Sequence, residues 1–164
     1  MPKPLTLHRM CRIGTMLLGL ALLAGCVGPQ SGRVGAATAL LNEYPPPGLA
    51  RIWIFRTYDP YITLETPYIR INGRIVGVAW LGSAFYRDVP PGRYAITVDS
   101  RGSAPNQFAN IGLAARQTAY IQIDANNWWA GMCWRCSIPT FYTYPIGPRL
   151  ARLAMAPLTL RASE

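Results

Sequence analysis

The chain has 164 residues, of which 51% are hydrophobic, and sixteen basic and seven acidic residues give it a formal net charge of +9. So large an apolar share excludes a disordered chain, while fifteen glycines and fifteen prolines argue against a helical bundle or a coiled coil. The length fits one domain at most, and an all-β domain is the first expectation.

The first 25 residues are predicted to be an export signal. Lys3, Arg9 and Arg12 form a basic segment, and the twelve residues Ile13–Ala24 form an apolar stretch. A membrane-spanning helix needs roughly 20 apolar residues, whereas the apolar region of a signal peptide has about 7 to 15. The stretch therefore indicates export and not a membrane span.

The signal ends in Leu23-Ala24-Gly25-Cys26, which resembles the lipobox of bacterial lipoprotein precursors. The resemblance implies cleavage before Cys26, diacylglycerol on its sulfur and usually an acyl chain such as palmitate on its amine. Several acyl chains anchor a protein to a bilayer without spanning it. The alternatives are an ordinary signal peptide with an unrelated cysteine, or an uncleaved anchor. Val27 follows in place of Asp, which in Gram-negative lipoproteins implies the outer membrane, facing the periplasm.

Residues 26–49 are predicted to be a flexible, lipidated tether. They are rich in Gly, Ala, Ser, Gln and Pro and end in Pro45-Pro46-Pro47-Gly48. A proline run favours an extended and semi-rigid backbone. The tether is expected to hold the folded domain a short distance from the lipid surface.

The folded domain is predicted to cover residues 50–147 and to open with strands. Ala50–Arg56 is a run of β-branched and aromatic residues, typical of a strand buried on both faces. Tyr68–Ile71 and Arg74–Val78 flank Asn72-Gly73, the strongest short signal for a hairpin. Pairing across this turn sets Ile71 opposite Arg74 and Ile69 opposite Val76.

Further strands recur at intervals of roughly 8 to 12 residues, which indicates an antiparallel sandwich or barrel. The segments 118–124 and 108–113 flank Ala114–Gln117 and are predicted to form a second hairpin with Ala119, Ile121 and Ile123 facing inward. The fold expected is an antiparallel β-sandwich of about seven strands. Its remaining strands are expected at Ala84–Val89, at Arg93–Asp99, where Tyr94, Ile96 and Val98 share one face, and at Ser137–Tyr144.

The tail, residues 148–164, has the pattern of a short helix. Leu150, Leu153 and Ala154 recur at helical spacing, and the neighbouring arginines are expected to face solvent. Pro157 would end any such helix within about two turns.

The stretch Ala50–Asp124 resembles a family of small bacterial envelope lipoproteins with a domain of unknown function, itself similar to PEGA-type and carboxypeptidase-regulatory, transthyretin-like β-sandwiches. The resemblance implies a transthyretin-like sandwich and brings no catalytic residues with it. It rests on Ile52–Arg56, Ile71-Asn72-Gly73 with Val76-Gly77, Pro90-Pro91-Gly92-Arg93-Tyr94, and Ala119–Ile123.

Two cysteines remain once Cys11 in the signal and Cys26 are set aside, in the run Cys133-Trp134-Arg135-Cys136. Residues three apart in a turn are close enough for a disulfide, and the cell envelope is oxidising. A structural disulfide is the main expectation, with free thiols and redox chemistry as the alternatives. The single histidine, His8, lies in the signal, so a zinc site lacks ligands and neither metal nor cofactor is expected.

The basic residues do not point to nucleic acid. After Arg12 they are thirteen arginines, which stand singly along the chain with no basic run and no recognisable nucleic-acid module. A positive balance of this kind indicates non-specific attraction to anions.

Catalysis is not expected. Without histidine in the mature chain, Ser-His-Asp and Cys-His arrangements are excluded. A pair of carboxylates, Asp59 and Glu65, is the remaining route to glycan cleavage. These two are more simply explained as solvated loop ions.

The segment 126–136 is the best candidate for a binding site. It brings Trp128, Trp129 and Trp134 together with Arg135 in an expected loop between strands. Such aromatic residues suit sugar rings, lipid headgroups or a partner protein, although they could instead cap the sandwich core. The sequence thus predicts a non-catalytic, lipid-anchored envelope protein with a binding or scaffolding domain. An accessory subunit of an envelope assembly is the alternative, and a glycan-acting enzyme is a distant third.

Overall fold

The computed structural model describes residues 40–41, 43–101, 107–129 and 137–161, without the side chains of 127–129 and 137–138. The described residues form nine strands and one helix. These are β1 (Ala50–Arg56), β2 (Tyr68–Ile71), β3 (Arg74–Val78), β4 (Ser83–Val89), β5 (Gly92–Val98), β6 (Phe108–Leu113), β7 (Thr118–Trp129), β8 (Ser137–Pro145), α3 (Pro148–Met155) and β9 (Thr159–Leu160).

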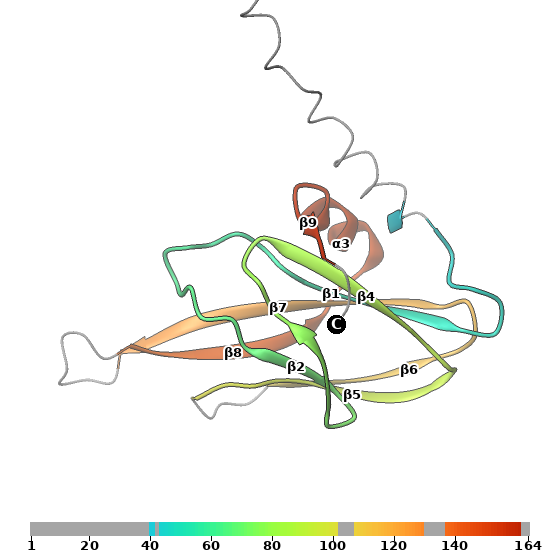
Figure 1. The fold of residues 1–164 in the computed structure, drawn as a ribbon, viewed down its shortest axis with the longest axis horizontal. Coiled ribbons are helices and arrows are strands. Elements are labelled where there is room, and N and C mark those ends of the chain that lie inside the picture. Colours follow the sequence, from blue (N-terminus) through green and yellow to red (C-terminus); the bar gives the residue numbers. More distant parts are fainter. Residues whose placement is uncertain (1–39, 42, 102–106, 130–136, 162–164) are drawn as a thin grey trace, which may run out of the picture. The chain divides into compact units, whose positions relative to one another are not determined.

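The strands form two sheets that pack face to face (Figure 1). One sheet has the order β8-β7-β1-β4-β9 and the other the order β3-β2-β5-β6. The all-β sandwich expected from the sequence is confirmed, with nine strands where about seven were counted. Two pairs are parallel, β1 with β7 and β4 with β9, and the other neighbours are antiparallel.

Strand β1 is buried on both faces because it lies in the middle of three layers. Ile52 and Ile54 belong to the core between the sheets, which also contains Ile69, Ile96 and Phe141. The alternate side chains, Trp53 and Phe55, lie in a second core on the other face of the same sheet. The apolar run of β1 therefore supplies both cores.

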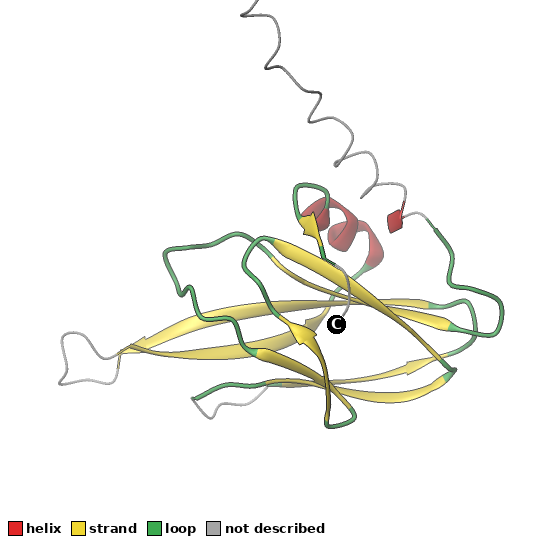
Figure 2. Cartoon of the chain, viewed as in Figure 1, coloured by secondary structure: helices red, strands yellow, loops and turns green. Residues whose placement is uncertain are grey.

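Helix α3 covers the second core, as the helix in Figure 2 shows above the five-stranded sheet. Ala151 and Met155, one helical turn apart, are buried there together with Leu158. The sequence pattern implied that Leu150 and Leu153 form the apolar face of this helix. This prediction is wrong, since these side chains are 65% and 67% exposed. The helix ends at Met155, two residues before Pro157, as the sequence predicted.

The β2–β3 hairpin follows its sequence signal closely. Asn72 and Gly73 have φ angles of 50° and 80°, which an Asn-Gly turn accommodates at low cost. Ile71 pairs with Arg74 as predicted, but Ile69 pairs with Gly77 and not with Val76. A bulge between Ile69 and Arg70 shifts the register by one residue.

The predicted hairpin of residues 108–124 is wrong, because its two strands belong to different sheets. β6 pairs with β5, whereas β7 runs parallel to β1. The turn between them is present, with the Gln117 amide donating to the Ala114 carbonyl at 3.1 Å. The chain uses this turn to cross from one sheet to the other.

The part of the expected tether that the structure describes lies against the domain. Leu41 is buried in the second core, Pro45 is fully buried, and the guanidinium of Arg116 lies 5.8 Å from the ring centre of Tyr44. Leu41 and Pro45 are therefore packed side chains within the segment 26–49 that the sequence predicted as a tether.

Candidate binding surfaces

One end of the sandwich, which we call the loop end, is organised by Arg56, the last residue of β1. Its guanidinium donates to the carbonyl oxygens of Thr63 at 2.8 Å, Glu65 at 2.5 Å and Ala79 at 3.2 Å. It also lies 5.2 Å from the ring centre of Phe141. One buried cation thus ties the β1–β2 loop, residues 57–67, to the end of β3 and to β8.

The charged guanidinium of Arg56 is almost completely buried. The side chain is buried, and this burial lowers the pKa of the guanidinium from its usual value. The carboxylates of Asp124 and Asp59 act in the opposite direction and raise it. An Arg pKa starts so high that the group stays charged at physiological pH, which keeps all its donors available to the loop.

The loop tied by Arg56 exposes large apolar side chains. Tyr61 is 95% exposed, and Tyr58 and Leu64 are exposed as well. Tyr58 also lies against the β3–β4 turn, because a Cβ atom built at Gly82 would meet Tyr58 Cδ2 at 3.2 Å. Aromatic groups held on an ordered loop are typical of binding surfaces, since they supply contact area at low entropic cost.

The β7–β8 hairpin extends beyond its neighbour at the same end (Figure 1). β1 pairs with β7 only as far as Gln122, while β7 and β8 remain paired as far as Trp129 and Ser137. Trp128 and Trp129 are therefore the last residues of a strand, and the expectation that they lie in a loop is wrong. The alternation of apolar residues ends at Ala125, before Asn126 and Asn127, and the strand predicted to end at Asp124 was therefore too short.

The outer face of this hairpin carries a row of polar and aromatic residues. Tyr142 and Tyr144 stack with ring centres 6.1 Å apart. Across the pair of strands, Asp124 lies opposite Tyr142 and Gln122 lies opposite Tyr144. Hydrogen-bonding groups next to aromatic faces suit polar ligands with apolar faces.

A shallow hollow of about 590 Å³ also lies at the loop end. Arg101 and Glu65 face each other across part of it, with a nitrogen and an oxygen 3.7 Å apart. Ser100 accepts a hydrogen bond from the Phe141 amide at 3.0 Å, which ties the β5 end to β8. The hollow is lined by Glu65, Thr66, Pro67, Tyr68, Asp99, Ser100, Arg101 and Phe141.

The two carboxylates considered for catalysis are engaged separately. Asp59 accepts a hydrogen bond from the Tyr61 amide at 3.1 Å, closing a local turn. Glu65 is turned toward Arg101. Both contacts are of the kind expected of loop ions, and neither is a contact between the two carboxylates.

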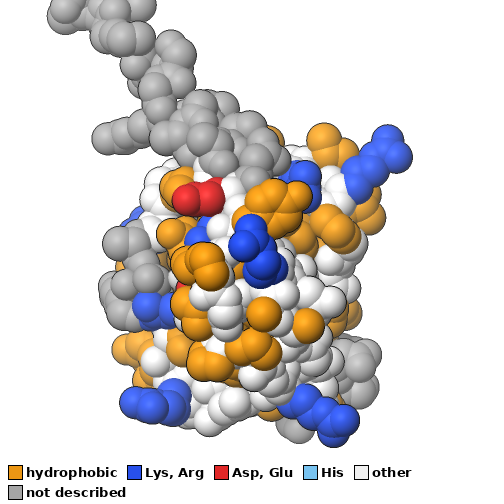
Figure 3. Space-filling view, turned by 90° about the vertical axis from the view of Figure 1, so that its right-hand side faces the viewer, with side chains coloured by type: hydrophobic (Ala, Val, Ile, Leu, Met, Phe, Trp, Pro, Cys, Tyr) orange, Lys and Arg blue, Asp and Glu red, His pale blue; other side chains and the backbone are white. Residues whose placement is uncertain are grey.

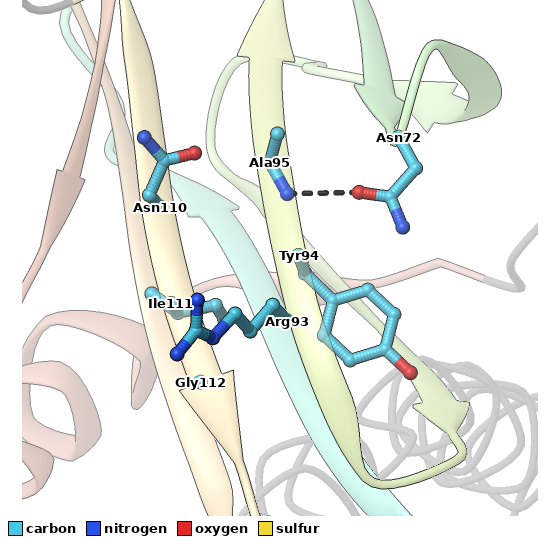
Figure 4. A pocket seen from close by; sticks show the side chains of 7 residues that line it. All are labelled: Asn72, Arg93, Tyr94, Ala95, Asn110, Ile111 and Gly112. Atoms are coloured by element: carbon cyan, nitrogen blue, oxygen red, sulfur yellow. Dashed lines mark hydrogen bonds between the residues drawn. The ribbon is translucent and has the colours of Figure 1, made fainter.

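A second hollow, of about 560 Å³, lies on the four-stranded sheet (Figure 4). Its surface includes Arg93 and Asn110, which are both exposed, and Asn72. The Asn72 side-chain oxygen accepts from the Ala95 amide at 2.9 Å, so this side chain is engaged in holding the hairpin turn. The hollow is open, and its lining is about equally polar and apolar.

The basic side chains are dispersed, as the sequence predicted. On the face shown in Figure 3 they stand apart from one another among apolar groups. Two of them form bidentate ion pairs within the fold, Arg51 with Asp88 at 2.7 and 2.9 Å and Arg70 with Asp99 at 2.8 and 3.0 Å. These two arginines therefore hold strands together within the fold.

Arg51 and Arg56 were not predicted to have special roles. Arg51 is buried, and its guanidinium lies 4.0 Å from the ring centre of Tyr86. The sequence did contain a signal, because an arginine lies near each end of an otherwise apolar strand. A charged side chain is buried only when it has a partner, so both arginines could have been expected to bind one. The partners come from residues distant in sequence, so the pattern alone did not identify them.

Several predicted site residues lie outside the described part of the chain. They are the lipidation site Cys26, the expected disulfide Cys133–Cys136, and Trp134 and Arg135. In the described ranges, no helix is long and apolar enough to cross a membrane. Nor do the side chains within those ranges bring three or more His, Cys, Asp or Glu close enough to hold a metal ion.

Comparison with known proteins leaves the chain unassigned. Its sequence matches no protein-family model and no curated protein.

Proposed function

We propose that this chain is a non-catalytic, lipid-anchored protein of the bacterial cell envelope whose β-sandwich binds another envelope component. The observation that carries the proposal is Leu23-Ala24-Gly25-Cys26, placed directly after a basic segment and a twelve-residue apolar stretch. Val27 favours the outer membrane, facing the periplasm. The resemblance to small envelope lipoproteins with transthyretin-like domains agrees with this assignment.

The binding surface we propose is the loop end. It combines the exposed Tyr58, Tyr61 and Leu64 with the protruding β7–β8 hairpin, in which Trp128 and Trp129 are the last residues of β7. Arg56 ties the loop to the end of β3 and to β8, so Tyr58 and Tyr61 are presented by an ordered support. Ordering before contact reduces the entropy lost on binding.

The absence of histidine after His8 supports a binding role over catalysis. The carboxylates Asp59 and Glu65 have local structural partners, which supports their assignment as loop ions. If glycan cleavage were nonetheless observed, its survival in Asp59→Asn and Glu65→Gln variants would exclude this pair as its source.

The anchor is tested by metabolic labelling with radioactive palmitate. The wild-type chain is expected to incorporate label and to sediment with membranes, whereas Cys26→Ala is expected to do neither. Cys11→Ala is the matched control and is expected to label normally. Label retained in Cys26→Ala would contradict the proposal.

The binding surface is tested by in-cell crosslinking and mass spectrometry. We expect Tyr58→Ser with Tyr61→Ser, or Trp128→Ala with Trp129→Ala, to lose the crosslinked component. Tyr44→Ser is the matched control, since Tyr44 is equally exposed but lies beside Arg116, away from the loop end. Unchanged crosslinks in both double variants would exclude the loop end.

The alternative, an accessory subunit joined through a strand edge, is favoured by one observation. β6 is an edge strand of six residues with neither proline nor charge, whereas the edge strand β8 contains Pro139 and Pro145. Edges without such protection can accept a further strand. Crosslinks that map to β6 and persist in the loop-end variants would support this function over the first.

A further inference from the structure

Helix α3 presents an unusual outward face. Leu150 and Leu153 are 65% and 67% exposed, and Arg149 and Arg152 are exposed beside them. Residues three apart are neighbours on a helix, so the two leucines form one pair and the two arginines another. The eight residues of α3 include no acidic one.

This face differs from the rest of the helix in having no packing role. The second core is reached by Ala151 and Met155, which are fully buried, and by the partly buried Ala154. Exchange of Leu150 or Leu153 for a polar residue would leave that core intact. Two large aliphatic side chains are thus kept in water by a helix that does not need them for folding.

The chain also enters the domain beside α3. Leu40 and Leu41 pack in the same core as Ala151 and Met155. Leu40 lies fourteen positions after Cys26 in the sequence, so the anchored cysteine can lie at most about 50 Å from this entry point. The chain length alone therefore allows the side of the domain that carries α3 to lie at the surface that holds the anchor.

We propose that the outward face of α3 rests on a membrane surface of anionic phospholipid, the surface into which the lipid anchor inserts. The inference rests on the proposed anchoring at Cys26. The leucines enter the boundary between headgroups and acyl chains, and the guanidinium groups of Arg149 and Arg152 bind lipid phosphates. Figure 1 shows α3 on the outer side of the five-stranded sheet, away from the four-stranded sheet.

A second copy of the chain suits this face less well. A two-fold contact through α3 would bring Arg149 and Arg152 close to the same two arginines of the other copy, with no acidic residue on the helix to balance them. Lipid phosphate supplies the opposite charge that the face lacks. The charges therefore favour a lipid surface as the occupant.

The test uses the full chain, purified from membranes and placed in nanodiscs of phosphatidylcholine alone or with about one quarter phosphatidylglycerol. A lipid with a photoreactive group near its headgroup is activated, and labelled peptides are quantified by mass spectrometry. We expect α3 to be labelled at least about fivefold more than β6 in the anionic discs. This ratio is expected to fall at high salt, which screens the attraction between the arginines and the lipid phosphates.

Two pairs of variants separate the face from general lipid contact. Leu150→Ser with Leu153→Ser is expected to reduce labelling of α3 to the level of β6. The matched control is Ile75→Ser with Phe108→Ser, two other exposed apolar residues, which lie in one row across the outer face of the four-stranded sheet. This control is expected to label as the wild type does.

Equal labelling of α3 and β6, no effect of the leucine variant, or a covalent dimer linked through α3 would overturn the proposal. The mass of the N-terminal peptide in the same sample shows whether Cys26 is acylated, so failure of the anchor is seen separately. If Cys26 is not acylated, flotation of the chain with phosphatidylglycerol vesicles tests the helix: flotation lost in the leucine variant supports the proposal, and no flotation overturns it.

Discussion

Replacing Arg56 by methionine tests whether one buried cation organises the loop end. Methionine fills much of the same space but removes the hydrogen bonds to the Thr63, Glu65 and Ala79 carbonyl oxygens. The bond to Ala79 is the one that is fully buried, and an oxygen left there without its donor costs about 1–3 kcal/mol. The lost contact with the Phe141 ring adds about 0.5–1 kcal/mol.

Part of this loss is offset, because the variant no longer buries a charge. The lowered pKa of Arg56, caused first by burial, shows that this opposing cost exists. We therefore expect the free energy of unfolding to fall by about 2 kcal/mol, since the two less buried carbonyls can bind water. For a domain of this size that corresponds to a melting temperature lower by about 6–10 °C.

The assay is thermal unfolding of the full chain in detergent, followed by circular dichroism, together with hydrogen exchange of residues 57–67. Faster exchange in this loop should accompany the fall in melting temperature. Arg70→Met is the control, since the Arg70–Asp99 pair is more exposed than Arg56 and its loss should have a smaller effect. A melting temperature within about 2 °C of the wild type and unchanged loop exchange would refute the assigned role of Arg56.

Three further substitutions test the packing of the sheets by the same unfolding assay. Asp88→Asn leaves the buried Arg51 without its anionic partner and should lower the free energy of unfolding by about 2–4 kcal/mol; a change below about 0.5 kcal/mol would contradict the burial of this pair. Gly77→Ala places a Cβ atom 2.8 Å from Phe85 Cζ and should cost about 1–3 kcal/mol, and an unchanged melting temperature would show that the ring can move aside. Gly73 has a φ angle of 80° and open space around it, so Gly73→Ala should lower the free energy of unfolding by about 1 kcal/mol from backbone strain alone. An unchanged free energy of unfolding would mean that residue 73 does not have this positive φ angle.

Local signals in the sequence predicted the strands well. The Asn72-Gly73 turn and the alternation of Tyr94, Ile96 and Val98 depend on neighbouring residues, and both hold in the structure. The apolar run of β1 predicted burial on both faces for the same reason. Such patterns predict whether each side chain points toward a core or toward solvent.

Patterns of this kind do not report which sheet a strand joins. β6 and β7 alternate in the same way and are joined by a short turn, yet β6 pairs with the preceding strand β5, whereas β7 pairs with β1, which is distant in sequence. Likewise, Leu150 and Leu153 show helical spacing, while the buried face is set by the smaller Ala151 together with Met155. Of the candidate site, the exposed aromatic loop and its tie to Arg56 depend on contacts between three segments, which the sequence does not display.

The order of strands in the five-stranded sheet has a consequence for biogenesis. β1 is synthesised first but lies in the centre, and its parallel partner begins at Thr118, roughly 65 residues later. Its cover, α3, follows later still. The apolar segment Ala50–Arg56 therefore has neither its β7 neighbour nor its helical cover until nearly the whole domain has emerged. We expect the nascent chain to depend on a holding chaperone over this interval, and pulse-labelled chains truncated before residue 118 to aggregate.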